Sequence, residues 1–184
     1  TSQVITLTGV DDNVSDGSQS TLLTLTPSGG DYGSVSAQTL TVTTSDNDTA
    51  GLTVMESGSG TTAVEGGDND TFTVRLASRP TGGVVLSVQA SNSADVSVNP
   101  TTLSFDNSLS SWQTAQTVTV SAVNDAVDDD NVTSTITISV NTSSTTDGKY
   151  DLVSSDNLTV VTVSDNDTVG LVLTKSSALV SENG

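Results

Sequence analysis

The stretch TFTVRLASRPTGGVVLSV, residues 71–88, decides the fold. Apolar and polar residues alternate along 71–76 and recur with the same period along 84–88, whereas RPTGG at 79–83 is rich in turn-forming residues. Alternation places successive side chains on opposite faces of a strand, so both ends of the stretch are predicted to be strands with one buried face. The predicted inward-facing side chains are Phe72, Val74, Leu76, Val84, Leu86 and Val88.

The same period continues beyond this stretch and marks further strands at Val118, Val120, Ala122, Ile136, Ile138, Val140, Leu158 and Val160. Clusters of Gly, Asn, Asp and Ser separate these runs, and no stretch has the apolar spacing of a helix. This pattern of about seven short strands predicts an all-β fold, an immunoglobulin-like antiparallel β-sandwich with essentially no helix. Phe105 and Trp112 are expected in its core.

The sequence also repeats itself. SDNDTAGL begins at residue 45 and SDNDTVGL at residue 164, which is 119 residues later, and seven of the eight residues are identical. Upstream, QVITLTGVDDNVSD from Gln3 aligns with QTVTVSAVNDAVDD from Gln116. A period of this length is typical of self-contained domains in a row. We therefore expect tandem repeats: the C-terminal part of a first repeat at 1–49, a complete repeat at 50–168 and the N-terminal start of a third at 169–184.

Charge and composition restrict the partners. The chain has 22 Asp and Glu but only 4 Lys and Arg, for a formal charge of -18, so it should repel nucleic acid and anionic lipid and attract cations. Cysteine and histidine are absent, which leaves no disulfide and no thiolate or imidazole metal site. No long apolar run occurs, so we expect no direct membrane insertion in this segment and any secretion signal or anchor outside it.

The acidic residues gather beside the predicted strands, at Glu65, Asp68, Asp70, Asp95, Asp125, Asp128, Asp129, Asp130, Asp165 and Asp167. Alternate loops of an antiparallel sandwich meet at one end, so these groups could share that end. Ca²⁺ takes six to eight oxygen ligands, which such loops can supply. A single Asp, such as Asp106 or Asp147, equally suits a turn. The run 128–130 favours a cation, because three adjacent like charges repel one another.

With these residues, the chain resembles the Calx-β family, the repeats of sodium/calcium exchangers, an integrin subunit and very large bacterial surface proteins. The DxD closing motif of the family is present, but its middle residue is Asn47 or Asn166 rather than the common Asp, and Asp95 lacks the usual following Tyr. The resemblance implies Ca²⁺ ligands in the complete repeat at Glu65, Asp95, Asp125, Asp128, Asp129, Asp130, Asp165 and Asp167. It implies partial sites at Asp12, Asp16, Asp46 and Asp48 in the first repeat and at Glu182 in the third.

These observations predict a calcium-binding structural repeat of a long extracellular surface protein, an adhesin or matrix extender, in which Ca²⁺ stiffens the joints between repeats. Its partners would be neighbouring repeats of the same chain or protein. One alternative is a secreted filament, a homopolymer assembled through repeat or strand exchange. Another is a Ca²⁺-dependent module that recognises glycan or protein, although Tyr32, Trp112 and Tyr150 are few for an aromatic platform. An enzyme is not expected, because the acids lie in short loops without His or Cys.

Overall fold

The computed structural model describes residues 2–174, 177, 180 and 182, without the side chains of residues 159–162. Eleven strands and two short 3-10 turns make up its secondary structure, and the described residues contain no α-helix. The predicted all-β fold with essentially no helix is therefore confirmed. None of the described segments is a helix long and apolar enough to cross a membrane.

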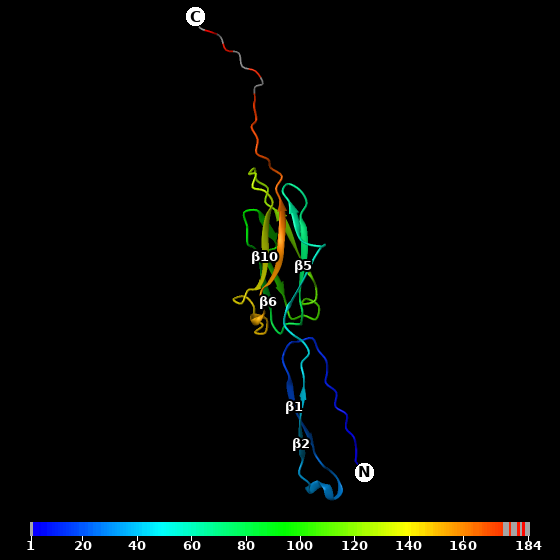
Figure 1. Ribbon diagram of the computed structural model, residues 1–184. Coiled ribbons are helices and arrows are strands. Elements are labelled where there is room, and N and C mark those ends of the chain that lie inside the picture. Colours follow the sequence, from blue (N-terminus) through cyan, green and yellow to red (C-terminus); the bar gives the residue numbers. More distant parts are fainter. Residues whose placement is uncertain (1, 175–176, 178–179, 181, 183–184) are drawn as a thin grey trace.

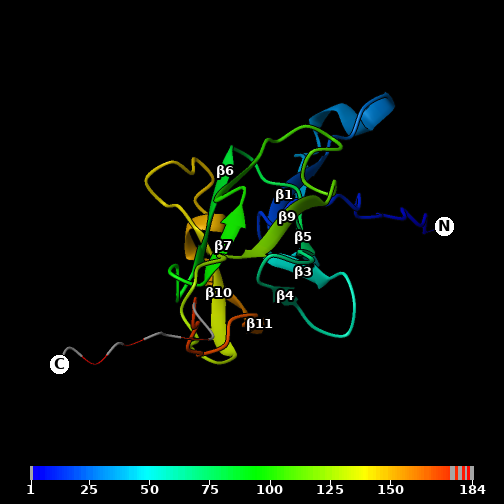
Figure 2. The ribbon, with the colours of Figure 1, turned by 90° about the horizontal axis from the view of Figure 1, so that it is seen from above.

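Nine strands form a two-sheet sandwich (Figure 1). One sheet has the order β3 (Leu52–Glu56), β5 (Asp70–Leu76), β9 (Gln116–Ala122) and β7 (Val96–Asn99). The other has the order β4 (Thr62–Val64), β11 (Asp156–Ser164), β10 (Val132–Val140), β6 (Val84–Ala90) and β8 (Thr102–Phe105). Figure 2 shows β3, β5 and β9 on one side and β6 and β10 on the other. The order of the central strands is that of the immunoglobulin fold.

The core between the sheets is made of the residues that alternation predicts. Phe72, Val74, Leu76, Val84, Leu86, Val88, Val118, Val120, Ile136 and Ile138 are all fully buried, and Phe105 and Trp112 join the same cluster. Ala122 and Val140 are partly buried and pack against it, whereas the side chain of Val160 lies outside the described residues. Each apolar side chain removed from water stabilises the sandwich by about 1.5 to 3 kcal/mol before entropy is counted.

A bulge changes the inward face of β11. Ile136 pairs with Leu158 but Ser134 pairs with Val161, so β11 has one residue more than β10 over this interval. An extra residue reverses the alternation, and Leu158 and Val163 are therefore both buried although they lie an odd number of residues apart.

A separate hairpin precedes the sandwich. Its strands β1 (Gln19–Leu25) and β2 (Gln38–Thr44) flank a 3-10 turn at Gly30–Ser34, and they align through the repeat with β10 and β11. Within the described residues no second sheet covers the hairpin, and Leu22 and Leu40 are 62% and 53% exposed. Residues 3–9 align with β9 but form no strand, since they pair with no strand in the described part of the chain.

The hairpin lies at one end of the sandwich and the C-terminal tail leaves from the other (Figure 1). We call the end beside the hairpin the proximal end; its loops include residues 77–83 and 141–155, the latter with the 3-10 turn Tyr150–Leu152. The opposite, distal end carries the loops at 65–69, 91–95, 123–131 and 165–169. This polarity matters because the predicted metal ligands of the complete repeat lie on the distal loops.

Candidate metal centre

Three carboxylates meet at the distal end. Glu65, Asp165 and Asp167 each place a carboxylate oxygen so that all three oxygens lie within 4.8 Å of one another. Glu65 is only 5% exposed, and its Oε2 is buried without a hydrogen-bond partner among the described residues. Oδ2 of Asp167 is buried and unpartnered in the same way. A buried carboxylate oxygen without a partner is unfavourable unless a cation lies beside it, and two residues of this cluster have one.

The parallel pairing of β4 with β11 creates this meeting. Thr62, Ala63 and Val64 pair with Thr162, Val163 and Ser164, and the amide of Glu65 continues the ladder with a 3.1 Å hydrogen bond to the carbonyl of Ser164. The residue after β4 is thereby placed beside the residues that follow β11. The pairing of two strands that lie 100 positions apart in the sequence thus brings their following residues into one cluster. Sequence spacing alone does not show this cluster.

The closing motif Asp165–Asn166–Asp167 is held by its own side chains. Oδ1 of Asp165 accepts a 2.8 Å hydrogen bond from the amide of Asp167, which forms an Asx-turn. Asn166 donates from Nδ2 to the carbonyl of Glu65 at 2.6 Å and to Oδ1 of Asn124 at 3.2 Å. The side-chain amide of Asn166 therefore links three loops, namely its own, the loop of Glu65 and the loop of Asn124.

Glycine is required at the turn that follows Glu65. Gly66 has a φ of 62°, in the left-handed region, and a Cβ there would lie 2.9 Å from Oδ1 of Asn124 and 3.1 Å from Nδ2 of Asn166. Only glycine fits this position without strain.

Further carboxylates surround the cluster. Burial raises the pKa of Glu65, and Asp165, Asp125, Asp167 and Asp129 raise it further. Burial, then Asp95, Asp165 and Asp125, likewise raise the pKa of Asp129, whose amide donates to Oδ2 of Asp165 at 3.1 Å. The predicted gathering of the acidic loops at one end is thus confirmed for residues of four loops.

The remaining predicted ligands of the complete repeat lie around this centre rather than in it. Asp128 accepts a 2.7 Å hydrogen bond from the amide of Val169, in the segment that leaves the sandwich. Asp130 is exposed and has a left-handed φ of 62°. Asp95 accepts a hydrogen bond from the amide of the Asn92 side chain. The assignment of these residues as ligands stays a prediction.

The first repeat reproduces the hydrogen bonds of the distal end. Oδ1 of Asp46 accepts from the amide of Asp48 at 2.8 Å, as Asp165 does from Asp167, and Asn47 donates to Asp11 at 3.2 Å, as Asn166 does to Asn124. Oδ2 of Asp46 accepts from the amide of Gly17 at 2.7 Å.

The acidic residues of this first repeat are less closely grouped than Glu65, Asp165 and Asp167 are at the distal end. Hydrogen bonds from the amides of Asp48 and Gly17 lower the pKa of Asp46, whereas burial, then Asp46, Asp11 and Asp12, raise the pKa of Asp48. Asp12 and Asp16 are exposed loop residues, and the exposed Glu182 of the tail does not join a described cluster.

Sequence reasoning missed Asp11 and Asn124 as parts of these ends. Their signal was present in the alignment, because Asp11 and Asn124 occupy equivalent positions directly before Asp12 and Asp125. The turn interpretation of Asp106 and Asp147 is confirmed, since they accept from the amides of Ser108 and Lys149 two residues onward.

Comparison with known proteins gives only distant likenesses. No family model and no curated protein match the chain. Among solved structures, the E. coli chaperone DraB has a TM-score of 0.41 with 10% identity, covering 65% of this chain and 59% of that one. The apo form of the Calx CBD1 domain has a TM-score of 0.39 with 13% identity, covering 63% and 98%. The S-layer protein rSbsC(31-844) has a TM-score of 0.36 with 20% identity, covering 73% of this chain and 16% of that one.

The chain thus spans less than two thirds of the first chaperone, and it covers 54% of a second, YadV. These likenesses do not assign the chain to a family.

Proposed function

We propose that this chain is a calcium-binding structural segment of a long extracellular surface protein, and that the ion is held at the distal end by Glu65, Asp165 and Asp167. The observation that supports this most strongly is the burial of Glu65 at 5% exposure with Oε2 unpartnered, beside two further carboxylates. A divalent cation would supply the missing partner and offset the repulsion among the acids.

The donors favour calcium over other metals. The chain has no His and no Cys, so soft and imidazole-preferring metals lack their usual ligands. Mg²⁺ demands a tight octahedron, whereas Ca²⁺ accepts six to eight oxygens in irregular geometry. Loop carboxylates, with Asp125 and Asp129 near the central three, suit the larger ion.

An ion at this position would act on the joint to the next segment. Asp167 and Asp128 both lie where the chain leaves the sandwich, and Asp128 accepts a hydrogen bond from the amide of Val169. With millimolar calcium outside the cell and a dissociation constant of about 10 to 100 μM, binding would stabilise the ordered end by roughly 1.5 to 3 kcal/mol. That free energy is sufficient to order a loop and to restrict the joint after Asp167.

A mechanical rather than catalytic role follows from the proposal. The two units lie end to end (Figure 1), and such an arrangement sets reach and rigidity in a surface protein. The acids of the centre serve as ion ligands in this account, so no reaction is proposed for them.

Amide hydrogen exchange measured by mass spectrometry tests the proposal. We expect Ca²⁺ to slow exchange at least tenfold in residues 123–131 and 164–170, because the ion would tie these loops together, and we expect a much smaller effect from Mg²⁺. The double variant Asp165→Asn with Asp167→Asn should abolish the calcium effect. The variant Asp31→Asn with Asp151→Asn, at exposed positions away from the distal end, is the matched control. Exchange in these loops that does not respond to calcium would contradict the proposal.

A further inference from the structure

The hairpin unit and the sandwich contact each other directly at the proximal end. The amide of Arg79 donates a 2.6 Å hydrogen bond to the carbonyl of Asn13, and Val14 forms a parallel β-bridge with Arg79. Beside this contact the amide of Ala77 donates to the carbonyl of Gly51 at 2.8 Å and extends the pairing of β3 with β5 within the sandwich. One main-chain hydrogen bond and the bridge at Arg79 therefore hold the upstream segment against the 77–83 loop, where a freely jointed linker would make no such contact.

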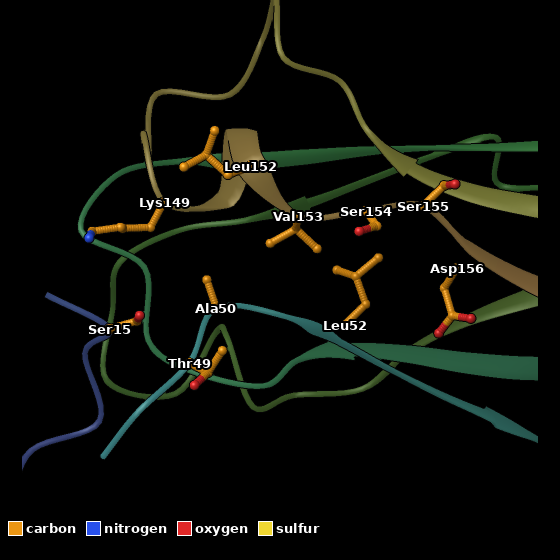
Figure 3. Close-up of a pocket in the computed structure, with 10 residues that line it drawn as sticks. All are labelled: Ser15, Thr49, Ala50, Leu52, Lys149, Leu152, Val153, Ser154, Ser155 and Asp156. Carbon is orange, nitrogen blue, oxygen red and sulfur yellow. The ribbon is translucent and has the colours of Figure 1, made fainter. Parts of the chain in front are cut away.

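A recess of about 520 Å³ lies between the two units (Figure 3). Ser15 and Thr49 line it from the upstream side. Lys149, Leu152 and Val153 line it from the sandwich. The acidic loop of the first repeat, residues 11–17, thus faces the 141–155 loop as well as the 77–83 loop.

The two proximal loops are fixed to each other by buried polar groups. Asp147 is 2% exposed and accepts hydrogen bonds from the amide and hydroxyl of Thr81 and from the amides of Lys149 and Tyr150. The hydroxyl of Tyr150 donates to the carbonyl of Ser78 at 2.7 Å. Arg79 and Lys149 are therefore held on one preformed surface.

The sandwich side of the joint places two cationic side chains opposite the acidic upstream side, beside its own Asp147, Asp151 and Asp156. Only four Lys and Arg occur in the chain, and two of them, Arg79 and Lys149, lie on this surface. The upstream side carries Asp11, Asp12, Asp16, Asp46 and Asp48. The Lys149 ammonium contributes to lowering the pKa of Asp46, after the amides of Asp48 and Gly17.

The distal end of the sandwich repeats the upstream contact element. Oδ1 of Asp125 accepts a 2.7 Å hydrogen bond from the amide of Val127, as Oδ1 of Asp12 does from the amide of Val14. Val127 aligns with Val14 and is 59% exposed.

We propose that the proximal surface around Arg79 and Lys149 is a docking site for the acidic loop of the preceding repeat, and that the 124–128 loop offers the same element to a following repeat. Main-chain pairing to Arg79 gives the joint its register, and Lys149 supplies a fixed counter-charge to the loop. The joint is then a defined interface that forms without metal at Glu65, so this inference goes beyond the proposed function.

Distances between two spin labels test the docked joint in the whole chain. Because the chain has no cysteine, Thr41→Cys on the hairpin and Thr102→Cys on β8 give one labelled pair at exposed positions. We expect a single narrow distance distribution in chelator. Arg79→Pro, which removes the donating amide, and Lys149→Gln should each broaden it at least twofold. Gln89→Glu, an exposed change of the same net charge as Lys149→Gln, is the control.

Broadening in either variant beyond that of Gln89→Glu supports the docked joint. A broad distribution in the parent chain, or widths in both variants equal to that of the control, overturns it. If Trp112 fluorescence shows that Arg79→Pro has unfolded the sandwich, Lys149→Gln alone decides. Measuring in chelator separates this outcome from the calcium proposal, which hydrogen exchange tests independently.

Discussion

At the scale of single residues, Glu65 shows how neighbours change the chemistry of a carboxylate. Burial and nearby acids raise the pKa of Glu65, so protonation of the folded chain relieves repulsion that the unfolded chain does not have. In chelator, stability should therefore increase as pH falls through this raised pKa toward the ordinary value of 4.5.

We predict that the urea midpoint in chelator is higher at about pH 5 than at about pH 7, since the folded state binds the extra proton. Glu65→Gln should flatten this dependence, whereas Glu56→Gln, on β3, should keep it. A slope that Glu65→Gln leaves intact would argue against a strained carboxylate here. Below pH 3.8 the trend should reverse, because Asp46, Asp70 and Asp106 have lowered pKa values and lose their stabilising hydrogen bonds as they protonate.

Asp147 is a buried carboxylate of the opposite kind. Burial raises its pKa, but hydrogen bonds from Thr81, Tyr150 and Lys149 outweigh burial and lower the pKa overall. We predict that Asp147→Asn lowers the free energy of unfolding by about 2 kcal/mol, because buried donors lose a charged acceptor. Urea unfolding measures this loss, with the exposed Asp151→Asn as control. Equal stability of the two variants would show that the Asp147 hydrogen bonds contribute little.

At the scale of elements, alternation predicted the strands well because burial of one face acts on each strand separately. The burial of Phe72, Val74 and Leu76 could be predicted without knowing which strands pair with theirs. The site was harder, since Glu65 joins Asp165 only through the parallel pairing of β4 with β11. Sequence placed the acids at one end but could not select which three would meet, or predict the bulge that reverses β11. Those depend on register between strands far apart in the chain.

The turn after β4 gives an element-scale prediction. Gly66→Ala must accommodate a left-handed φ and a Cβ 2.9 Å from Oδ1 of Asn124, which should cost about 1 to 2 kcal/mol of folding free energy. Displacing this turn should also weaken calcium binding several-fold, because Glu65 precedes it directly. Gly58→Ala, where a Cβ meets no atom within 4 Å, is the control. Thermal melts with and without calcium measure both effects, and identical behaviour of the two variants would contradict the role of this turn.

At the scale of the whole molecule, the formal charge is -18, and many of the acidic residues gather at two ends that point the same way along the chain. Each acidic end lies at the point in the chain where one structural unit is followed by the next. At the upstream joint the following unit contributes Lys149, whereas the distal end of the sandwich has the buried Glu65 and no described cation beside it. A metal ion would therefore relieve more repulsion at the distal end than at the upstream joint, and we propose that this ion is calcium.

Calorimetric titration of the chain with calcium tests that claim most directly, with Glu65→Gln as the variant and Glu56→Gln as the matched control. The account predicts binding to the parent and control chains with a dissociation constant of about 10 to 100 μM. It predicts affinity at this site weakened at least tenfold in Glu65→Gln, which corresponds to about 1.4 kcal/mol. A parent chain that takes up no calcium, or an isotherm of Glu65→Gln that superimposes on the parent's, would contradict it.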